Sequence, residues 1–420
     1  MRNRAAITVS EAPLSTDKST QDRVLDAAAE LFWKKGFGAT TTREIAASLG
    51  IRQASLYHHV ASKEDLLYQL CVTSLEQFLR DVNGALDKPG PPLDRMRVLI
   101  HVHLTTLLKR QRSNAVMSTE LRALTGAYRA EVLKARAQYA GLVRGMIEEA
   151  QTAGFLRTDI ASKYLCLALL NILNWTLLWF RMDDALSTDH LAEFISVIFL
   201  EGAATSQARD TFHMPEPQRR PKKPAALQTA SVTRLLNKAA GLFAKKGYDL
   251  TSTREIAQTA GIQKASLYYH IDTKEDLLYA ICKSSLEQIR SDVEAALEPV
   301  ADPLQRIAAL IRAHIESVLR DQDRHAAALS EMHALSAERR AEVVKLRDDY
   351  ESLVRSVLQE AQKAGLLRDD VPVKYLCLGL LGLLNRVMVW FRRSGSLSPS
   401  RLGELFARIY LTGAAASPRS

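Results

Sequence analysis

The sequence predicts an all-α protein made of two tandem copies of one unit, and three observations support this prediction. Aromatic residues make up only 6% of the 420 residues and there are 19 glycines, which does not favour a large sheet. Apolar residues recur at helical spacing almost throughout, as in residues 24–32. The chain also repeats itself without a gap at an offset of 211 positions, so that KYLC at 163–166 recurs at 374–377. A period this long indicates a duplicated two-part unit and not a solenoid.

Each copy opens with short helices whose ends can be read from capping residues. In the first copy an apolar helix ends near Gly36, which suits a C-terminal cap. A capping box, in which a hydroxyl and a carboxylate satisfy exposed amides, starts a second helix at 41–44 and again at 252–255. Gly50 and Gly261 then allow the tight turn that precedes a third, short helix.

A long helix is predicted to start at the caps in 62–65 and 273–276, and further amphipathic helices follow it. The runs KYLCLALLNILNWTLLWFRM and KYLCLGLLGLLNRVMVWFRR are apolar nearly all round. The apolar part of the first, from Tyr164 to Phe180, is shorter than the roughly 20 residues that span a bilayer, and the second carries Arg386. We therefore interpret both as helices buried on several sides and expect no membrane partner.

Composition shifts divide the chain into six segments. A flexible tail is expected at 1–19 and a Pro-rich basic linker at 205–229. The short helical domains are placed at 20–66 and 230–277, and the larger helical domains at 67–204 and 278–415.

Charge and cysteine usage restrict the class of protein. The net charge of +9 favours a polyanionic partner, although nucleic acid and acidic lipid fit it equally well. The first 20 residues contain no apolar core of signal-peptide length, so we expect a cytoplasmic protein. The four cysteines lie far apart and form no CxxC pair, so we expect buried thiols and neither a metal nor another cofactor.

The helix, glycine turn and second helix have the outline of a helix-turn-helix, whose second helix enters the major groove. In the short helix of the first copy, Ile51, Ala54 and Leu56 are expected to pack inward. Donors for the groove and for phosphates are expected from Arg52, Gln53, Ser55, Tyr57, His58 and His59.

At these residues both copies resemble the tetracycline-repressor (TetR) family of transcriptional regulators. The signature runs from AELFWKKGFGATTTREIA through LGIRQASLYHHVASKEDLL and recurs as AGLFAKKGYDLTSTREIA and AGIQKASLYYHIDTKEDLL. The resemblance implies a sequence-specific regulator that binds double-stranded DNA.

The resemblance also implies roles for individual residues of each head. Arg43 and Arg254 would touch bases or backbone. Base reading would fall to Gln53, Ala54 and Ser55 in the first copy and to Lys264, Ala265 and Ser266 in the second. Mainly phosphate contacts are implied for Tyr57, His58, His59 and Lys63, and for Tyr268, Tyr269, His270 and Lys274.

The two reading heads differ where bases are read. Gln53 suits adenine through a bidentate amide contact, whereas Lys264 suits guanine. The changes from Arg52 to Gln263 and from His58 to Tyr269 also favour different half-sites for the two heads. We expect an operator that is an imperfect palindrome with unequal halves.

A helical ligand and assembly domain in each unit is a further implication of the resemblance. Its last helix, at 191–200 and 402–411, would pack with the preceding apolar helix into a four-helix bundle. If the two units of one chain pair, the chain is an intramolecular pseudo-dimer with heads about 34–36 Å apart, one turn of DNA. A homodimer formed through either unit is the alternative.

Four polar residues beside the apolar helices are candidate ligand contacts: Asn174, Arg181, Asn385 and Arg392. Alternatively, the asparagines bridge the bundle and the arginines cap helix C-termini. The LLN and WFR patterns look like the part of the family that controls fatty-acid, steroid or aromatic acid breakdown, often in response to acyl-coenzyme A thioesters. Because Arg386 replaces Trp175 and Gly382 replaces Asn171, the two pockets are not equivalent.

Two other classes compete with a ligand-responsive repressor. An enzyme is disfavoured because His101 and His103 are two residues apart on a predicted helix and no catalytic grouping stands out. A DNA-bound scaffold without a small-molecule effector remains the alternative.

Overall fold

A computed structural model describes residues 19–87, 89–180, 186–202, 230–263, 265–267, 271–392, 394–395 and 397–413, with residues 209, 212 and 214. Within these ranges every regular element is a helix, which confirms the all-α prediction. The expected N-terminal tail and linker lie almost wholly outside the described residues.

The first unit follows the predicted order of a short helical head and a larger helical domain. Helix α4 runs without a break from one into the other, so the expected boundary after residue 66 falls inside a helix. The elements are α1 (Thr20–Ala39), α2 (Thr42–Ser48), α3 (Gln53–Leu56), α4 (Lys63–Leu86), α5 (Pro92–Lys109), α6 (Gln111–Glu120), the 3-10 helix η1 (Leu121–Ala123), α7 (Gly126–Thr152), α8 (Ser162–Trp179) and α9 (Thr188–Glu201).

The second unit repeats this order with one clear difference. Helix α8 is continuous, whereas its counterpart is divided at Arg386, the position that holds Trp175 in the first unit. The elements are α11 (Ala230–Lys246), α12 (Thr253–Ala260), α14 (Lys274–Leu297), α15 (Pro303–Arg320), α16 (Gln322–Ser330), η2 (Met332–Ala334), α17 (Ala337–Lys363), α18 (Val373–Asn385), α19 (Val387–Trp390) and α20 (Pro399–Thr412).

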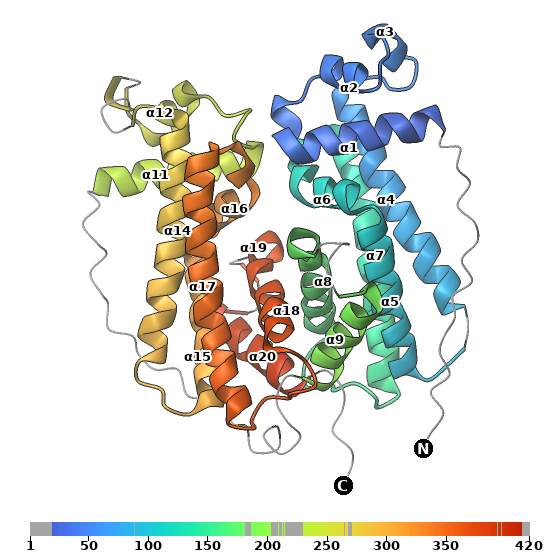
Figure 1. Cartoon of the computed structure of the whole chain (residues 1–420), viewed down its shortest axis with the longest axis vertical. Helices are drawn as coiled ribbons and strands as arrows, with labels where there is room; N and C mark the ends of the chain where they lie inside the picture. The colour runs from blue at the N-terminus through green and yellow to red at the C-terminus, as the bar shows by residue number, and fades with distance from the viewer. Residues whose placement is uncertain are drawn as a thin grey trace.

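The two units meet through their last helices in the middle of the molecule (Figure 1). Buried residues of α8 and α9 belong to one continuous apolar core with those of α18 and α20. The ends of α9 and α20 approach so closely that only glycine fits. A Cβ on Gly202 would lie 2.4 Å from the carbonyl oxygen of Leu411, and one on Gly413 would lie 2.4 Å from that of Leu200.

Polar contacts across this junction come in reciprocal pairs. Arg157 Nη1 donates to Thr412 Oγ1 at 2.7 Å, and its counterpart Arg368 donates through Nη1 to the carbonyl of Gly202 at 3.3 Å. These contacts tie each unit to the end of the last helix of the other, as expected for an interface with approximate two-fold symmetry.

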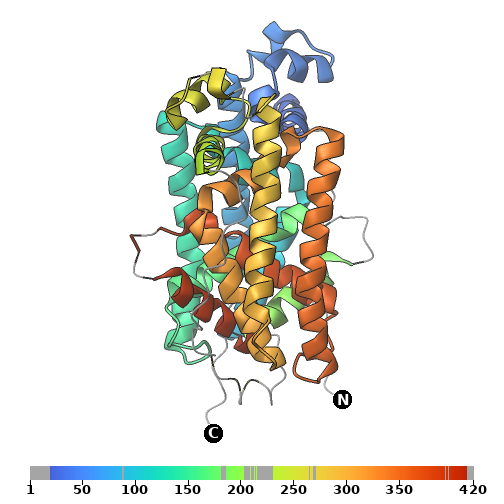
Figure 2. The ribbon, with the colours of Figure 1, turned by 90° about the vertical axis from the view of Figure 1, so that its left-hand side faces the viewer.

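Both heads lie at the same end of the molecule, with α2, α3 and α12 at the top of the view (Figure 1). The side view shows the long helices α14 and α17 running from this end toward the opposite one (Figure 2). Helix α14 begins in the second head, at Lys274, and continues into the larger domain.

The apolar helix of the second unit is the one helical stretch among the described residues that is long and apolar enough to span a membrane, at Val373–Trp390. Of this stretch 61% is buried inside the molecule. That burial agrees with the predicted core helix.

Candidate nucleic-acid interface

Local contacts specified by the sequence hold the first recognition helix. Thr41 Oγ1 accepts from the Glu44 N–H at 3.2 Å and the Glu44 carboxylate accepts from the Thr41 N–H at 2.9 Å, which is the predicted capping box. A hydrogen bond from Lys35, together with those from Thr41, lowers the pKa of Glu44 to about 2. Gly50 takes a left-handed φ of 68° at the turn, and the fully buried Leu56 anchors α3.

Most side chains expected to meet DNA are exposed on this head. Arg43, Arg52, Ala54, Tyr57, His58 and His59 are exposed, and Gln53 and Ser55 are partly buried. The expectation that Ala54 packs inward is wrong. Helix α3 spans only four residues, and Leu56 takes the inward position.

A small network sets the position of the main base-reading candidate. Gln53 Nε2 donates to Thr42 Oγ1 at 2.9 Å, and Thr42 Oγ1 lies 3.2 Å from the Tyr57 hydroxyl. The first residue of α2 thus links both ends of α3. We did not expect Thr42 from the sequence, because its role depends on how α2 and α3 cross.

Lys63 is directed into the head. Its ammonium donates to the carbonyls of Phe37 at 2.7 Å, Gly38 at 3.2 Å and Thr40 at 2.8 Å, and it lies 4.4 Å from the centroid of the Phe37 ring. Burial lowers the pKa of Lys63. In this arrangement the lysine fastens the turn between α1 and α2 to α4, and its contact with a phosphate stays a prediction.

The second head repeats this clamp. Lys274 Nζ donates to the carbonyls of Tyr248 at 2.9 Å and Thr251 at 3.0 Å, and it lies 4.0 Å from the centroid of the Tyr248 ring. Burial again lowers the pKa of the lysine. The aromatic residue at this position, Phe37 or Tyr248, is the sequence signal for the clamp.

The recognition region of the second head is described only in part. Arg254, Gln263, Ala265 and Ser266 are exposed, and Leu267 is fully buried like its counterpart Leu56. Lys264, Tyr268, Tyr269 and His270 lie outside the described residues. The unequal reading of bases by the two heads therefore stays a prediction.

The candidate ligand residues do not converge on one site. Asn174 Nδ2 donates to the carbonyl of Leu170 in its own helix at 2.7 Å, so it does not bridge the bundle as the alternative supposed. The residue that does cross is Asn171, whose Nδ2 donates to the carbonyl of Leu383 at 3.3 Å. Arg392 is exposed and donates to the carbonyl of Phe391 at 3.2 Å, as a residue capping a helix C-terminus does. Arg181 lies outside the described residues.

Two buried histidines occupy equivalent places in the two larger domains. His103 Nδ1 lies 2.7 Å from the Tyr139 hydroxyl, and His314 Nδ1 lies 2.7 Å from the Tyr350 hydroxyl. Burial lowers the pKa of each histidine to about 3, so both are neutral at ordinary pH. The remaining ligand candidate, Asn385, lies close enough to His314 to oppose the lowering of its pKa.

A small pocket lies at the junction of the units, lined by α8, α9 and α18. The rings of Phe194 and Tyr375 stack there at 5.1 Å between centroids, and the ring of Trp179 lies 6.4 Å from that of Tyr375. The indole Nε1 of Trp179 is buried and has no hydrogen-bond partner among the described residues. The lining is mainly apolar, and the free space inside it is about that of one water molecule.

The four thiol groups lie apart from one another in the core. Cys71, Cys166, Cys282 and Cys377 are all buried and free. Burial raises the pKa of each thiol to about 12. Among the described residues no group of three or more His, Cys, Asp and Glu side chains could hold a metal ion.

Two family models match the chain, each of them twice. The model of bacterial regulatory proteins of the tetR family matches residues 24–70 and 235–281. The model of the tetracyclin repressor-like C-terminal domain matches residues 89–203 and 300–414. Together they cover most of the chain and both heads.

Individual proteins match one unit at a time. The HTH-type transcriptional repressor KstR2 of Rhodococcus jostii is 28% identical over 186 residues, which is 44% of this chain and 90% of that protein. The fatty acid metabolism regulator protein of Bacillus subtilis is 21% identical over 157 residues, 37% of this chain and 81% of that protein. The crystal structure of the TetR family regulator PfmR from Thermus thermophilus is 33% identical, covers 43% of this chain and 98% of its own, and has a TM-score of 0.41. The chain therefore belongs to the tetR family of bacterial transcriptional regulators and carries two family units in tandem.

Proposed function

We propose that this protein is a cytoplasmic, ligand-responsive repressor that binds an operator through two unlike heads. The observation that carries the proposal is that α2, α3 and α12 lie at one end of a single molecule, with Arg43, Arg52 and Arg254 exposed on them or beside them. Cationic side chains on such helices neutralise phosphates while the recognition helix enters the major groove. As a family member it acts by binding DNA, and we expect no catalysed reaction.

A footprint on the promoter next to the protein's own gene tests this function. We expect protection of two half-sites that face the same side of the duplex, weakening steeply as salt is raised. Protection that is equal on unrelated DNA of the same length would refute sequence-specific binding.

Unequal half-sites are the second part of the proposal. Gln53 in the first head and Lys264 in the second prefer adenine and guanine respectively, and the exposed Arg52 and Gln263 differ as well. Selection of binding sites from random DNA should return an asymmetric consensus. A symmetric consensus would refute unequal reading.

The third part is that the chain works as an intramolecular pseudo-dimer. Its support is the fit between unlike residues: Trp175 packs against Gly382, where a Cβ would lie 2.9 Å from the Cβ of Trp175. If two first units paired, Asn171 would replace Gly382 and its side chain would collide with the tryptophan. Light scattering should give the mass of one chain at micromolar concentration, whereas a dimer that persists on dilution would favour the homodimer.

The fourth part of the proposal is that an apolar or acyl-coenzyme A compound binds the protein as its effector. The operon that the protein controls would then serve the breakdown of lipids, steroids or aromatic acids. Two proteins that resemble this chain are the repressor KstR2 and a regulator of fatty acid metabolism. The pocket between α8, α9 and α18 is lined mainly by apolar side chains. Acyl-coenzyme A compounds should release the protein from its operator in a DNA-shift assay. If none of a graded series of chain lengths does so, a regulator or scaffold without an effector becomes the better account.

A further inference from the structure

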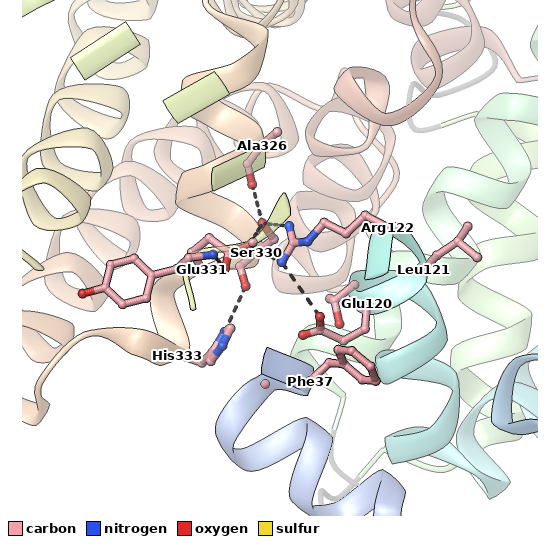
Figure 3. Close-up of polar contacts among 12 residues, drawn as sticks. Phe37, Glu120, Leu121, Arg122, Ala326, Ser330, Glu331 and His333 are labelled. Carbon is pink, nitrogen blue, oxygen red and sulfur yellow. Dashed lines mark hydrogen bonds and ion pairs between the residues drawn. The ribbon is translucent and has the colours of Figure 1, made fainter. Parts of the chain in front are cut away.

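A buried polar cluster joins the two units just below the heads (Figure 3). It contains two carboxylates at equivalent positions, Glu120 at the end of α6 and Glu331 before η2, which are 7% and 2% exposed. Arg122 of η1 lies between them. The cluster therefore places one guanidinium beside two buried carboxyl groups, and burial raises the pKa of Glu120.

Within this cluster, Arg122 makes the polar contacts that cross between the units. Its guanidinium forms an ion pair with Glu331, donates through Nη1 to Ser330 Oγ at 2.9 Å, and lies 4.0 Å from the carboxylate of Glu120. A guanidinium holds such partners in fixed directions because its donors lie in one plane. The side chain thus sets an orientation as well as a distance.

Each carboxylate of the cluster is bonded to the turn of its own head. Glu331 accepts from the Tyr248 N–H at 2.8 Å, and Glu120 accepts from the Phe37 N–H. The carbonyls of these same two residues accept from Lys274 and Lys63, the clamps at the start of α14 and α4. A continuous series of hydrogen bonds and ion pairs therefore runs from one head to the other through Arg122.

Stability alone does not explain a buried cluster of this kind. Two ions removed from water lose hydration that their attraction only partly replaces, and apolar residues of similar size often stabilise a protein as well or better. In some proteins a buried ion pair instead selects one geometry for the elements that it joins. Here the joined elements are the two heads.

The cluster is not symmetric. The counterpart of Arg122 is His333, whose Nδ1 lies 3.0 Å from the carbonyl of Ser330 in its own unit. Its ring lies against Gly36 of the first head, where a Cβ would be 2.6 Å from Nε2. One cation from one unit therefore makes the polar link, and the other unit contributes close packing.

We propose that Arg122 is a positioning residue that fixes the separation of the two recognition helices and so the half-site spacing that the protein accepts. This inference rests on the proposed operator-binding function for its DNA consequence, although the link between the heads can be measured without DNA. Loss of the guanidinium should let the heads move independently while leaving each head folded.

The DNA-free test uses spin labels on the full chain. Ser48 and Thr259 are exposed at equivalent places in α2 and α12, and the four native cysteines are buried, so S48C and T259C provide the labelling sites. The distribution of distances between labels should be narrow in the parent and clearly broader in R122M, with R122K between them. Arg112, which pairs with Glu30 on the surface of the same unit, gives the control R112M. A distribution as narrow in R122M and R122K as in R112M would overturn the proposal.

The DNA test starts from the duplex that the parent protein selects. It compares this duplex with versions whose spacer is two base pairs longer or shorter, and with a duplex that contains one half-site. Two base pairs rotate one half-site by about 70° around the axis. The parent should lose about tenfold in affinity or more, and R122M should lose less than about threefold while binding the single half-site like the parent. A spacing penalty that is unchanged in R122M overturns the proposal even if its overall affinity falls. Failure of the parent to select any sequence would instead refute the proposed function and leave the label distances to decide the link.

Discussion

The packing of Trp175 against Gly382 allows a quantitative test of the interface between the units. A Cβ on Gly382 would lie 2.9 Å from the Cβ of Trp175 and 3.2 Å from its Cγ, whereas carbon atoms in contact normally lie about 3.5–4.0 Å apart. The conflict involves the Cβ, which is bonded to the backbone of α8 and cannot swing away. Replacing Gly382 by alanine must therefore move α8 and α18 apart.

The size of the effect follows from two opposing terms. An extra methyl group in a well-packed core costs about 1–3 kcal/mol. Alanine in a helix is more favourable than glycine by about 1 kcal/mol. Gly145 in α7 provides a matched control, because a Cβ there meets nothing within 4 Å and only the second term applies. G382A should therefore be less stable than G145A by about 1–3 kcal/mol.

Thermal unfolding of the full chain measures this difference. A difference of 1 kcal/mol corresponds to roughly 2–4 °C in Tm for a domain of about 200 residues, so G145A should rise in Tm while G382A rises less or falls. Equal increases in Tm for the two variants would refute the packing argument. So would a loss of stability in G382A that persists after Trp175 is truncated to alanine, because the clash needs the tryptophan.

Three further predictions concern the heads and the core. K63M should lose about 1–3 kcal/mol of unfolding free energy in urea, because three partly buried carbonyls lose their donor; an unchanged midpoint would mean that water replaces the lysine. Burial lowers the pKa of His103 from 6.5 to about 3, so the unfolded chain binds a proton more readily than the folded protein between these two pH values. The free energy of unfolding should therefore fall by about 1.4 kcal/mol per pH unit as the pH drops from 6.5 toward 3. H103Q should flatten this dependence, and parallel curves for the two proteins would contradict it. Exchanging Gln53 and Lys264 should invert the order of half-sites in the selected operator, and an unchanged order would show that other residues read these bases.

Most features that depend on local sequence were predicted well. The capping box predicted at 252–255 is only half formed, because Ser252 accepts from the Glu255 N–H while the Glu255 carboxylate pairs with Lys246. The capping box before α2, the cap that starts α14 and the glycine turn at Gly50 need only neighbouring residues, and the structure contains all three. The tandem repeat followed from the constant offset, and the matches of both family models confirm it. Local hydrogen bonds and backbone conformation determine such features before any tertiary contact forms.

Roles that depend on distant neighbours were not predicted. Asn174 was expected to serve the ligand or the bundle, yet the donor that crosses the interface is Asn171, three positions earlier. The two positions are only about 60° apart around α8, so the helical pattern does not separate them, and only the placement of α18 shows which one meets the other unit. Lys63 likewise has a sequence typical of a phosphate contact, but the carbonyls that it binds come from a turn more than 20 residues earlier.

Covalent linkage removes a restriction that two-fold symmetry places on the residues where the units meet. In a symmetric homodimer, every substitution near the two-fold axis is present in both subunits. A tryptophan that needs a glycine opposite it would then require each subunit to carry both residues. Two linked units escape this restriction, because Trp175 and Gly382 need to occur only once each, on opposite faces. The same freedom allows Arg122 to face His333 and Glu331 without a second arginine competing for the same carboxylates. Unlike residues at the junction, and in α3 and its counterpart, are compatible with the proposed intramolecular pair and not with a symmetric pair of identical units.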